Sequence, residues 1–155
     1  MRSLNHVTLI ACLLAIAAAK KAWRDVDTLQ IGVKHKPEDC PRKSQLSDEV
    51  QVHYTGWLTD GTQFGSSIGE EPFKFQMGEG DVIEGWEQGL FNMCVGEKRR
   101  LKVPAALGYR DKGFADLGIP AGASLYFDTE LISIEDGPMV IHLDANSLNN
   151  LSEFY

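Results

Sequence analysis

Aromatic side chains between residues 54 and 127 are the main chemical resource of this sequence. Tyr54, Trp86 and Tyr109 each carry a hydroxyl or an indole N–H that can donate a hydrogen bond from an otherwise apolar surface. Pockets for small ligands and peptides are typically lined by apolar side chains with a few such polar groups. The other rings in this stretch include Phe64, Phe73, Phe75, Phe114, Tyr126 and Phe127. A simple hydrophobic core built from these rings is the alternative, and it is favoured for Phe75.

Conventional catalytic sets are not found in the sequence. None of the 4 histidines has neighbours arranged as a nucleophile elbow or a metal-binding pair. His53 lies in a predicted strand, between Val52 and Tyr54, where a packed or solvent-facing histidine is more common than a metal ligand. Gly78 and Gly80 are not followed by the Lys-Ser or Lys-Thr of a phosphate-binding loop. We therefore expect no covalent catalysis, no metal and no cofactor.

The charge balance and the apolar runs exclude two classes of partner. The chain has 155 residues, with 15 Lys and Arg against 22 Asp and Glu, which gives a net charge of −7. Nucleic acid is not expected as a partner, because binding to a phosphate backbone needs clustered cations. No apolar run reaches the roughly 18 to 20 residues that a membrane span requires. The composition is that of one globular domain.

Residues 1–19 have the pattern of a secretory signal peptide. Arg2 precedes an apolar run that begins at Val7 and ends in small residues at 17–19. A buried N-terminal helix is the alternative, but the run is too short to span a membrane and Lys20 follows at once. We expect cleavage after Ala19, a short N-terminal lead in residues 20–28, and a protein of the endoplasmic reticulum lumen or a secreted one.

Removal of the signal peptide would leave two of the 3 cysteines, because Cys12 lies within it. In an oxidising compartment, one disulfide is the simplest interpretation of the remaining pair, Cys40 and Cys94. Two separate buried thiols are an alternative. A zinc site is less favoured, because two cysteines without paired histidines do not supply four ligands.

The apolar periodicity predicts a strand-rich domain with one short helix. Alternating patterns predict strands near residues 29–33, 50–54, 73–75, 101–103 and 124–134. Asp60-Gly61 predicts a hairpin turn, and helical spacing of Trp86, Leu90 and Phe91 predicts a helix over 84–92. About five strands and one helix indicate an α+β domain with an antiparallel sheet wrapped around one short helix. An all-β sandwich would leave the apolar face of that helix without a partner.

Several sequence blocks, in the same order, closely resemble the FK506-binding protein (FKBP) family of peptidyl-prolyl cis/trans isomerases. The blocks are Val52-His53-Tyr54-Thr55-Gly56, Asp60-Gly61-Thr62-Gln63-Phe64, Pro72-Phe73-Lys74-Phe75, Val82-Ile83-Glu84-Gly85-Trp86, Leu107-Gly108-Tyr109, Ile119-Pro120 and Ala123-Ser124-Leu125-Tyr126-Phe127. The resemblance assigns residues 29–136 to an FKBP-type isomerase domain. The positions of Cys40 and Cys94 also resemble those of small secretory-pathway members, in which these cysteines form a bridge.

The resemblance implies an isomerase of X-Pro bonds in secretory-pathway proteins. It implies proline-containing client polypeptides as partners and FK506- or rapamycin-type macrolides as further candidate ligands. The implied catalytic residues are Tyr54, Phe64, Trp86, Tyr109 and Phe127, and the implied substrate- or macrolide-binding residues are Phe73, Asp81, Val82, Ile83 and Ile119. A non-catalytic, proline-peptide-binding chaperone that uses the same pocket is the alternative, followed by a calcium-regulated adaptor.

The sequence departs from the family pattern at two positions close to the expected pocket. Gly65 stands where the family usually has Asp, and Arg110 follows Tyr109 in place of the common Gly. Compared with the family pattern, the loop from Phe64 to Phe73 is also shorter by one residue, and the flap over residues 110–118 is longer by one residue. Because Gly65 removes a carboxylate from the expected pocket rim, we predict reduced isomerase activity.

Residues 137–155 form a tail with a weak calcium-binding pattern. Asp144 and Asn146 occupy the first and third positions of an EF-hand loop, but Asn149 replaces the turn glycine and Tyr155 replaces the bidentate glutamate. We interpret the tail as a degenerate EF-hand remnant without a working metal site. Asn150 begins a glycosylation sequon with Leu151 and Ser152.

Overall fold

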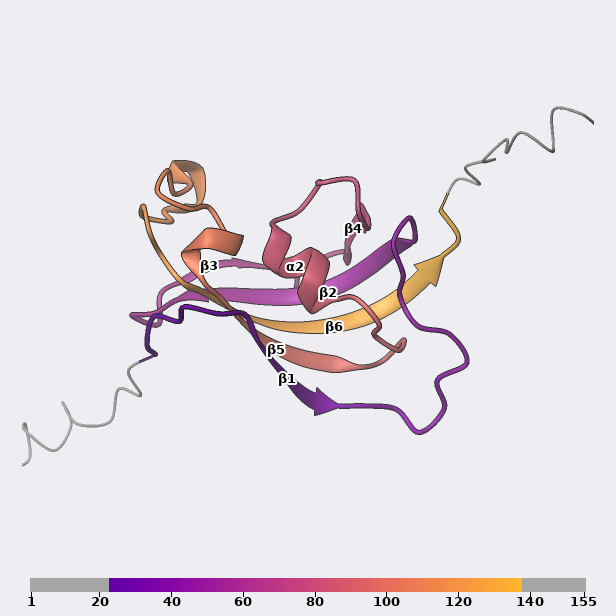
Figure 1. Ribbon diagram of the computed structural model, residues 1–155. Helices are drawn as coiled ribbons and strands as arrows, with labels where there is room; N and C mark the ends of the chain where they lie inside the picture. Colours follow the sequence, from indigo (N-terminus) through magenta and orange to yellow (C-terminus); the bar gives the residue numbers. More distant parts are fainter. Residues whose placement is uncertain (1–22, 138–155) are drawn as a thin grey trace, which may run out of the picture.

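The computed structural model describes residues 23–137, which form one antiparallel sheet around a short helix (Figure 1). The strands are β1 (Gln30–His35), β2 (Glu49–Leu58), β3 (Gln63–Ser66), β4 (Phe73–Gln76), β5 (Lys98–Val103) and β6 (Leu125–Glu135). They follow the order β1-β5-β6-β2-β3, and β4 also pairs with β2. The predicted fold class is confirmed, with six strands where the patterns predicted about five. The predicted signal peptide at 1–19, part of the predicted lead and the tail from 138 lie outside the described residues.

Strand β2 changes partner along one edge, and this change fixes Tyr54. Residues 49–52 pair with β4, whereas residues 55–57 pair with β3. In the gap, Tyr54 donates its backbone N–H to Oγ of Ser67 at 3.0 Å, and the backbone N–H of Ser67 donates to the carbonyl oxygen of Tyr54 at 3.0 Å. The buried Ser67 therefore satisfies the backbone of Tyr54 where neither strand reaches it.

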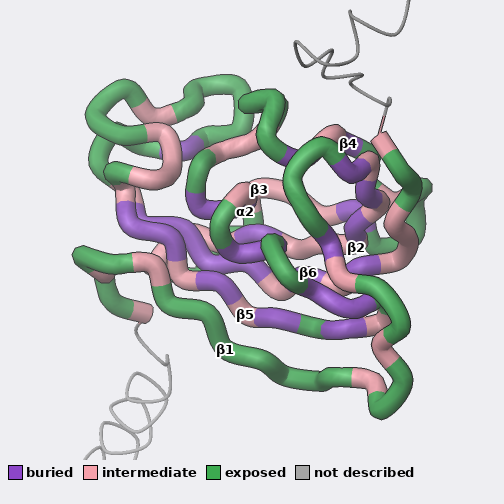
Figure 2. The backbone as a smooth tube through the Cα atoms, turned by 45° about the vertical axis from the view of Figure 1, so that its right-hand side comes forward, coloured by how far each residue is buried: buried purple, intermediate pink, exposed green. Residues whose placement is uncertain are grey.

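The hydrophobic core lies between the sheet and helix α2 (Glu84–Gly89). Its sheet side comes from buried residues of β2, β5 and β6, which include the purple stretches of the sheet in Figure 2, whereas the edge strand β1 is exposed throughout. A Cβ atom at Gly85 would lie 2.4 Å from the Val103 side chain, and one at Gly89 would lie 2.6 Å from that of Leu101. The two glycines thus let the helix approach β5 closely, despite their low helix propensity.

Helix α2 is shorter than the predicted span of 84–92, because it ends at Gly89. Leu90 is buried at 1% exposure, but Phe91 is 46% exposed and does not belong to the apolar face of the helix. Asn92 has a φ of 61°, a left-handed conformation that a helix cannot continue through. The helix therefore cannot extend through Asn92, and Phe91 stays partly exposed beyond its end.

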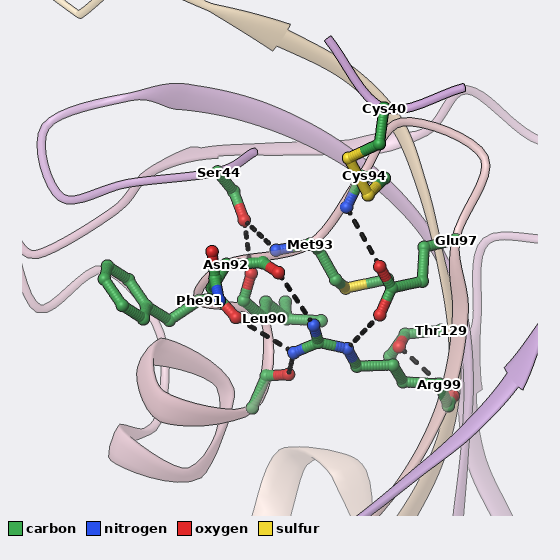
Figure 3. Close-up of polar contacts among 11 residues, drawn as sticks. Cys40, Ser44, Leu90, Phe91, Asn92, Met93, Cys94, Glu97, Arg99 and Thr129 are labelled. Carbon is green, nitrogen blue, oxygen red and sulfur yellow. Dashed lines mark hydrogen bonds and ion pairs between the residues drawn. A yellow bond between two sulfur atoms is a disulfide. The ribbon is translucent and has the colours of Figure 1, made fainter. Parts of the chain in front are cut away.

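A disulfide joins Cys40 to Cys94, with the two Cα atoms 5.4 Å apart. This confirms the predicted bridge and excludes the alternative of two separate thiols. The bond ties the segment after β1 to the turn between α2 and β5 (Figure 3). Next to it, Ser44 donates its hydroxyl to the carbonyl oxygen of Leu90 at 2.6 Å and accepts the N–H of Met93 at 2.9 Å.

The described part of the predicted lead, from Trp23, packs on the face of the sheet opposite α2. The Trp23 ring lies 4.6 Å from the Tyr126 ring and 5.5 Å from the Trp57 ring, measured between centroids. The Tyr126 hydroxyl donates to the carbonyl oxygen of Arg24 at 2.6 Å. Tyr126 therefore belongs to this outer cluster and does not line the cavity beside α2. Within residues 23–137, no helix has the length and hydropathy needed to cross a membrane.

Candidate active site

A cavity of about 360 Å³ opens on the same side of the sheet as α2. Figure 1 shows the loop before α2 and the orange segment after β5 on this side. The cavity is lined by Tyr54, Phe64, Phe73, Gly80, Asp81, Val82, Ile83, Trp86, Tyr109, Leu117 and Phe127. Most of these side chains are apolar, and Asp81 is the one acidic residue among them. The cavity is therefore a small apolar hollow with few polar groups.

Trp86 is at the base of the cavity, where it is only 4% exposed. The rings of Tyr54, Phe127 and Phe73 meet it edge-on, with centroid distances of 5.1, 5.3 and 6.0 Å. Edge-to-face contacts of this kind hold aromatic rings in fixed relative orientations. The indole Nε1 is buried and has no hydrogen-bond partner within residues 23–137. An apolar, rigid surface with one unused donor therefore lies at the base of the site.

The backbone of Gly56 creates room for one wall of the cavity. A Cβ atom at this position would lie 2.6 Å from the Phe64 ring and 3.0 Å from the Phe127 ring. These two rings meet edge-on at 5.6 Å between centroids. Any side chain at Gly56 would therefore displace the Phe64 ring.

The opposite wall comes from the segment after β5, which contains the short 3₁₀ helices η1 (Ala105–Leu107) and η2 (Ala115–Leu117). Tyr109 stacks on Phe114 with a centroid distance of 5.2 Å and an interplanar angle of 11°. Burial raises the pKa of the Tyr109 hydroxyl, and the neighbouring Tyr54 raises it further. The hydroxyl is therefore neutral at physiological pH and can donate a hydrogen bond into the cavity.

All the residues proposed from sequence for this site line the cavity except Ile119. That side chain is 3% exposed and belongs to the core, where its backbone pairs with Phe114 through hydrogen bonds of 2.8 and 3.0 Å. Leu117, which is 41% exposed, and Gly80 also line the cavity and were not predicted for it. Leu117 belongs to an irregular flap, where no periodic pattern could have marked it.

The polar groups of the cavity set the chemistry it can offer. Among residues 23–137, no three or more His, Cys, Asp or Glu side chains cluster so as to hold a metal ion. The cavity itself offers ring faces, two tyrosine hydroxyls and the carboxylate of Asp81. It can enclose an apolar group and donate hydrogen bonds to the carbonyl groups on either side.

Comparison with known proteins identifies the family. Residues 40–132 match the model of the FKBP-type peptidyl-prolyl cis-trans isomerases. The chain belongs to this family. The FKBP15-1 isomerase of Arabidopsis thaliana is 49% identical over 144 residues, covering 92% of this chain and 91% of its own. The FKBP2 isomerase of Mus musculus is 51% identical over 125 residues, covering 80% of this chain and 88% of its own.

A solved structure agrees with the FKBP assignment. The crystal structure of AtFKBP13 has a TM-score of 0.63 to this structure at 30% sequence identity, and the match covers 73% of this chain and 98% of that one. The family resemblance inferred from the motifs is thus confirmed. FKBP proteins bind proline-containing peptides and macrolides such as FK506.

Proposed function

We propose that this FKBP protein catalyses X-Pro isomerisation in the cavity above Trp86, on client polypeptides of the secretory pathway. The indole of Trp86 carries the proposal, because it offers a prolyl ring a flat surface that is only 4% exposed to water. Tyr54, Phe64 and Phe127 would surround the ring, and Phe73, Val82 and Ile83 would contact the flanking backbone. Of the residues proposed from sequence, only Ile119 is withdrawn from the contact set.

The chemistry needs no acid, base or metal. Rotation about a peptide bond meets a barrier of roughly 18 to 20 kcal/mol, because resonance gives the C–N bond partial double-bond character. Resonance also places charge on the oxygen and nitrogen, and water stabilises that charge. Moving the bond into an apolar cavity removes this stabilisation from the planar form and favours the less polar, twisted form. Only binding that is stronger in the twisted state raises the rate.

Two donors would hold the substrate carbonyls while the bond turns. The carbonyl oxygen of Ile83 accepts the N–H groups of Trp86 at 2.9 Å and of Glu87 at 3.3 Å, which fixes Ile83 at the start of α2. The backbone N–H of Ile83 makes no backbone hydrogen bond within residues 23–137, so it is available to a substrate. The Tyr109 hydroxyl is the second donor, kept protonated by its raised pKa.

An isomerisation assay on a proline-containing tetrapeptide tests the site. We expect the wild-type protein to accelerate cis/trans exchange, FK506 to inhibit it, and Trp86→Leu to lose most of the acceleration. Lys36→Leu, at an exposed position after β1, is the matched control and is expected to behave as the wild type. If Trp86→Leu folds normally and retains the full rate, the cavity is not the active site.

A peptide-binding chaperone with weak or no isomerase activity is the second candidate. Gly65 favours it, because the site lacks the carboxylate that the FKBP pattern has there. The two functions separate in one experiment with an unfolded, proline-containing client. A chaperone suppresses aggregation without increasing the rate of the proline-limited refolding phase, whereas an isomerase increases that rate.

The proposed location rests on the disulfide and the predicted signal peptide. A disulfide such as Cys40–Cys94 is typical of proteins that fold in an oxidising compartment. Mass spectrometry of the unreduced protein from secreting cells would report the N-terminal residue, the bridge and a glycan on Asn150 together. An N-terminus at Met1 on the mature protein would contradict the proposal.

A further inference from the structure

Exposed carboxylates lie close in sequence to the residues that line the cavity. Asp81 lines the cavity itself, and five others lie within three positions of a lining residue. The set, here called the acidic rim, consists of Glu70, Glu71, Glu79, Asp81, Glu84 and Asp116. All six are exposed, so their charges face the solvent that a substrate must cross. They come from three separate loops and the start of α2, each of which contains or adjoins a residue that lines the cavity.

The carboxylates of the acidic rim form almost no ion pairs. Within residues 23–137, Glu84 is the one member that lies within ion-pair distance of a basic group, and its contact with Arg110 is long, at 3.9 Å. Lys74, which follows Phe73, is paired instead with Glu49 at 2.6 Å. Three cations also lie within three positions of a lining residue, namely Lys74, Arg110 and Lys112. Six carboxylates against three cations leave net negative charge at the opening of the site.

The basic residues of the sheet are directed elsewhere. On β5, Leu101 and Val103 face the core, so the alternating Lys98, Arg100 and Lys102 lie on the outer face. Lys98 pairs with Glu130 at 3.0 Å, Arg100 pairs with Asp128, and Lys102 lies over the Tyr126 ring at 5.8 Å. These cations are on the opposite side of the sheet from the cavity, where they do not neutralise the rim.

The proposed position of the prolyl ring depends on Trp86 and not on the acidic rim. Trp86 is buried at the base of the cavity with its Nε1 unpaired. A prolyl ring seated there continues into backbone on both sides, because proline in a client is an internal residue. The flanking residues must then leave the apolar hollow across the acidic rim.

We propose that the acidic rim makes this isomerase selective for proline segments flanked by lysine or arginine. The inference rests on the proposed active site, and it names the class of client that this site accepts. An exposed pair of opposite charges contributes modestly, so two flanking cations are expected to raise kcat/KM by about fivefold in total. Charges at a cleft mouth also increase the association rate, an effect that salt suppresses.

Three peptides that share one X-Pro core test the selectivity. They carry Lys, Gln or Glu on both sides of the core, and exchange is followed by NMR, so that no charge-sensitive coupling protease is needed. We expect rates in the order Lys, Gln, Glu at low ionic strength, and we expect the differences to shrink in about 0.5 M salt. Acceleration of the Gln peptide with equal rates for the Lys and Glu peptides would overturn the selectivity alone. No acceleration of the Gln peptide would overturn the proposed function itself.

Paired variants separate the rim from the net charge of the protein. Glu70→Gln with Glu71→Gln removes two rim charges, and it is expected to lower the ratio of Lys-peptide to Glu-peptide rates toward one. Glu38→Gln with Asp39→Asn makes the same change in net charge on the loop after β1, at the opposite edge of the sheet from β3. This control is expected to leave the ratio unchanged. An equal loss in both variants would assign the effect to net charge and overturn the role of the rim.

Discussion

The guanidinium of Arg99 donates a hydrogen bond to the carbonyl oxygen of Gly89, 2.7 Å away, at the residue where α2 ends. The same group donates to the carbonyl oxygens of Phe91 at 2.9 Å and Asn92 at 3.0 Å, and Glu97 holds it from the other side at 2.6 Å (Figure 3). The last carbonyls of a helix have no partners within the helix. Arg99 therefore satisfies the end of the helix that carries Trp86.

Loss of Arg99 is expected to destabilise the fold and to loosen α2. Arg99→Met leaves the buried Glu97 without its cation, and removal of one partner of a buried pair costs about 3 to 5 kcal/mol. Urea unfolding measures this cost. Glu97→Gln combined with Arg99→Met removes the orphaned charge and should recover part of the loss. A double variant no more stable than Arg99→Met would show that the carbonyl contacts, not the ion pair, dominate.

Loss of the disulfide is expected to reduce stability by a similar amount. Cys40 and Cys94 are separated by 54 positions in the sequence, and closing a loop of this length restricts the unfolded chain by about 4 kcal/mol in the entropic model. Cys40→Ser with Cys94→Ser should therefore lower the urea midpoint. Wild-type protein in reductant is the control and should show the same shift. An unchanged midpoint in both would mean that the bridge adds nothing to stability.

The sequence predicted the strands and the helix whose apolar residues recur at regular spacing. The strand alternation and the spacing of Trp86 and Leu90 report side chains that face one core, so β2, β6 and α2 could be located. The resemblance then placed most of the cavity wall. Leu117 was missed, because it belongs to the irregular flap and has no periodic signature, whereas Ile119, which the resemblance assigned to the pocket, lies in the core. The Trp23 contacts with Trp57 and Tyr126 were missed for another reason, since they join residues far apart in the chain.

A side chain at Gly56 is expected to close the active site. In Gly56→Ala the new Cβ would meet the Phe64 ring at 2.6 Å, a distance that forces the ring to move. Displacement of a substrate-positioning group commonly costs up to about 100-fold in rate, so we expect kcat/KM to fall by at least tenfold. Gly32→Ala is the matched control, because its Cβ would come no closer than 3.7 Å to another atom. Similar rates for both variants would show that Phe64 does not shape the reactive cavity.

Restoring the carboxylate at Gly65 is expected to increase isomerase activity. A Cβ at this position would lie 3.4 Å from the Tyr54 hydroxyl, which is close to ordinary van der Waals contact. An aspartate there can accept a hydrogen bond from a tyrosine hydroxyl, and a hydrogen bond to a charged group is worth about 1.5 to 3 kcal/mol. Gly65→Asp should therefore fix Tyr54 more firmly and raise kcat/KM on a proline tetrapeptide. Gly65→Asn is the uncharged control, and equal rates for wild type and Gly65→Asp would contradict the prediction.

The raised pKa of Tyr109 predicts how stability changes at alkaline pH. Burial is the main cause of the shift and Tyr54 the second, so the folded state keeps the Tyr109 proton to higher pH than the unfolded state does. The unfolded chain loses that proton near the ordinary value of about 10. Above that pH the folded state binds more protons, and the free energy of unfolding must fall as pH rises toward the folded pKa. Tyr109→Phe lacks this contribution entirely.

Urea unfolding of wild type and Tyr109→Phe at a series of pH values checks this dependence. Between about pH 6 and 8 the two stability curves should run parallel, because Tyr109 is protonated in both states there. Above about pH 10 the wild-type curve should fall more steeply than that of the variant. The isomerase rate should persist to the same alkaline range, since the neutral hydroxyl is the form that donates to a substrate carbonyl. Curves that stay parallel throughout would mean that Tyr109 is as exposed to water in the folded protein as in the unfolded chain.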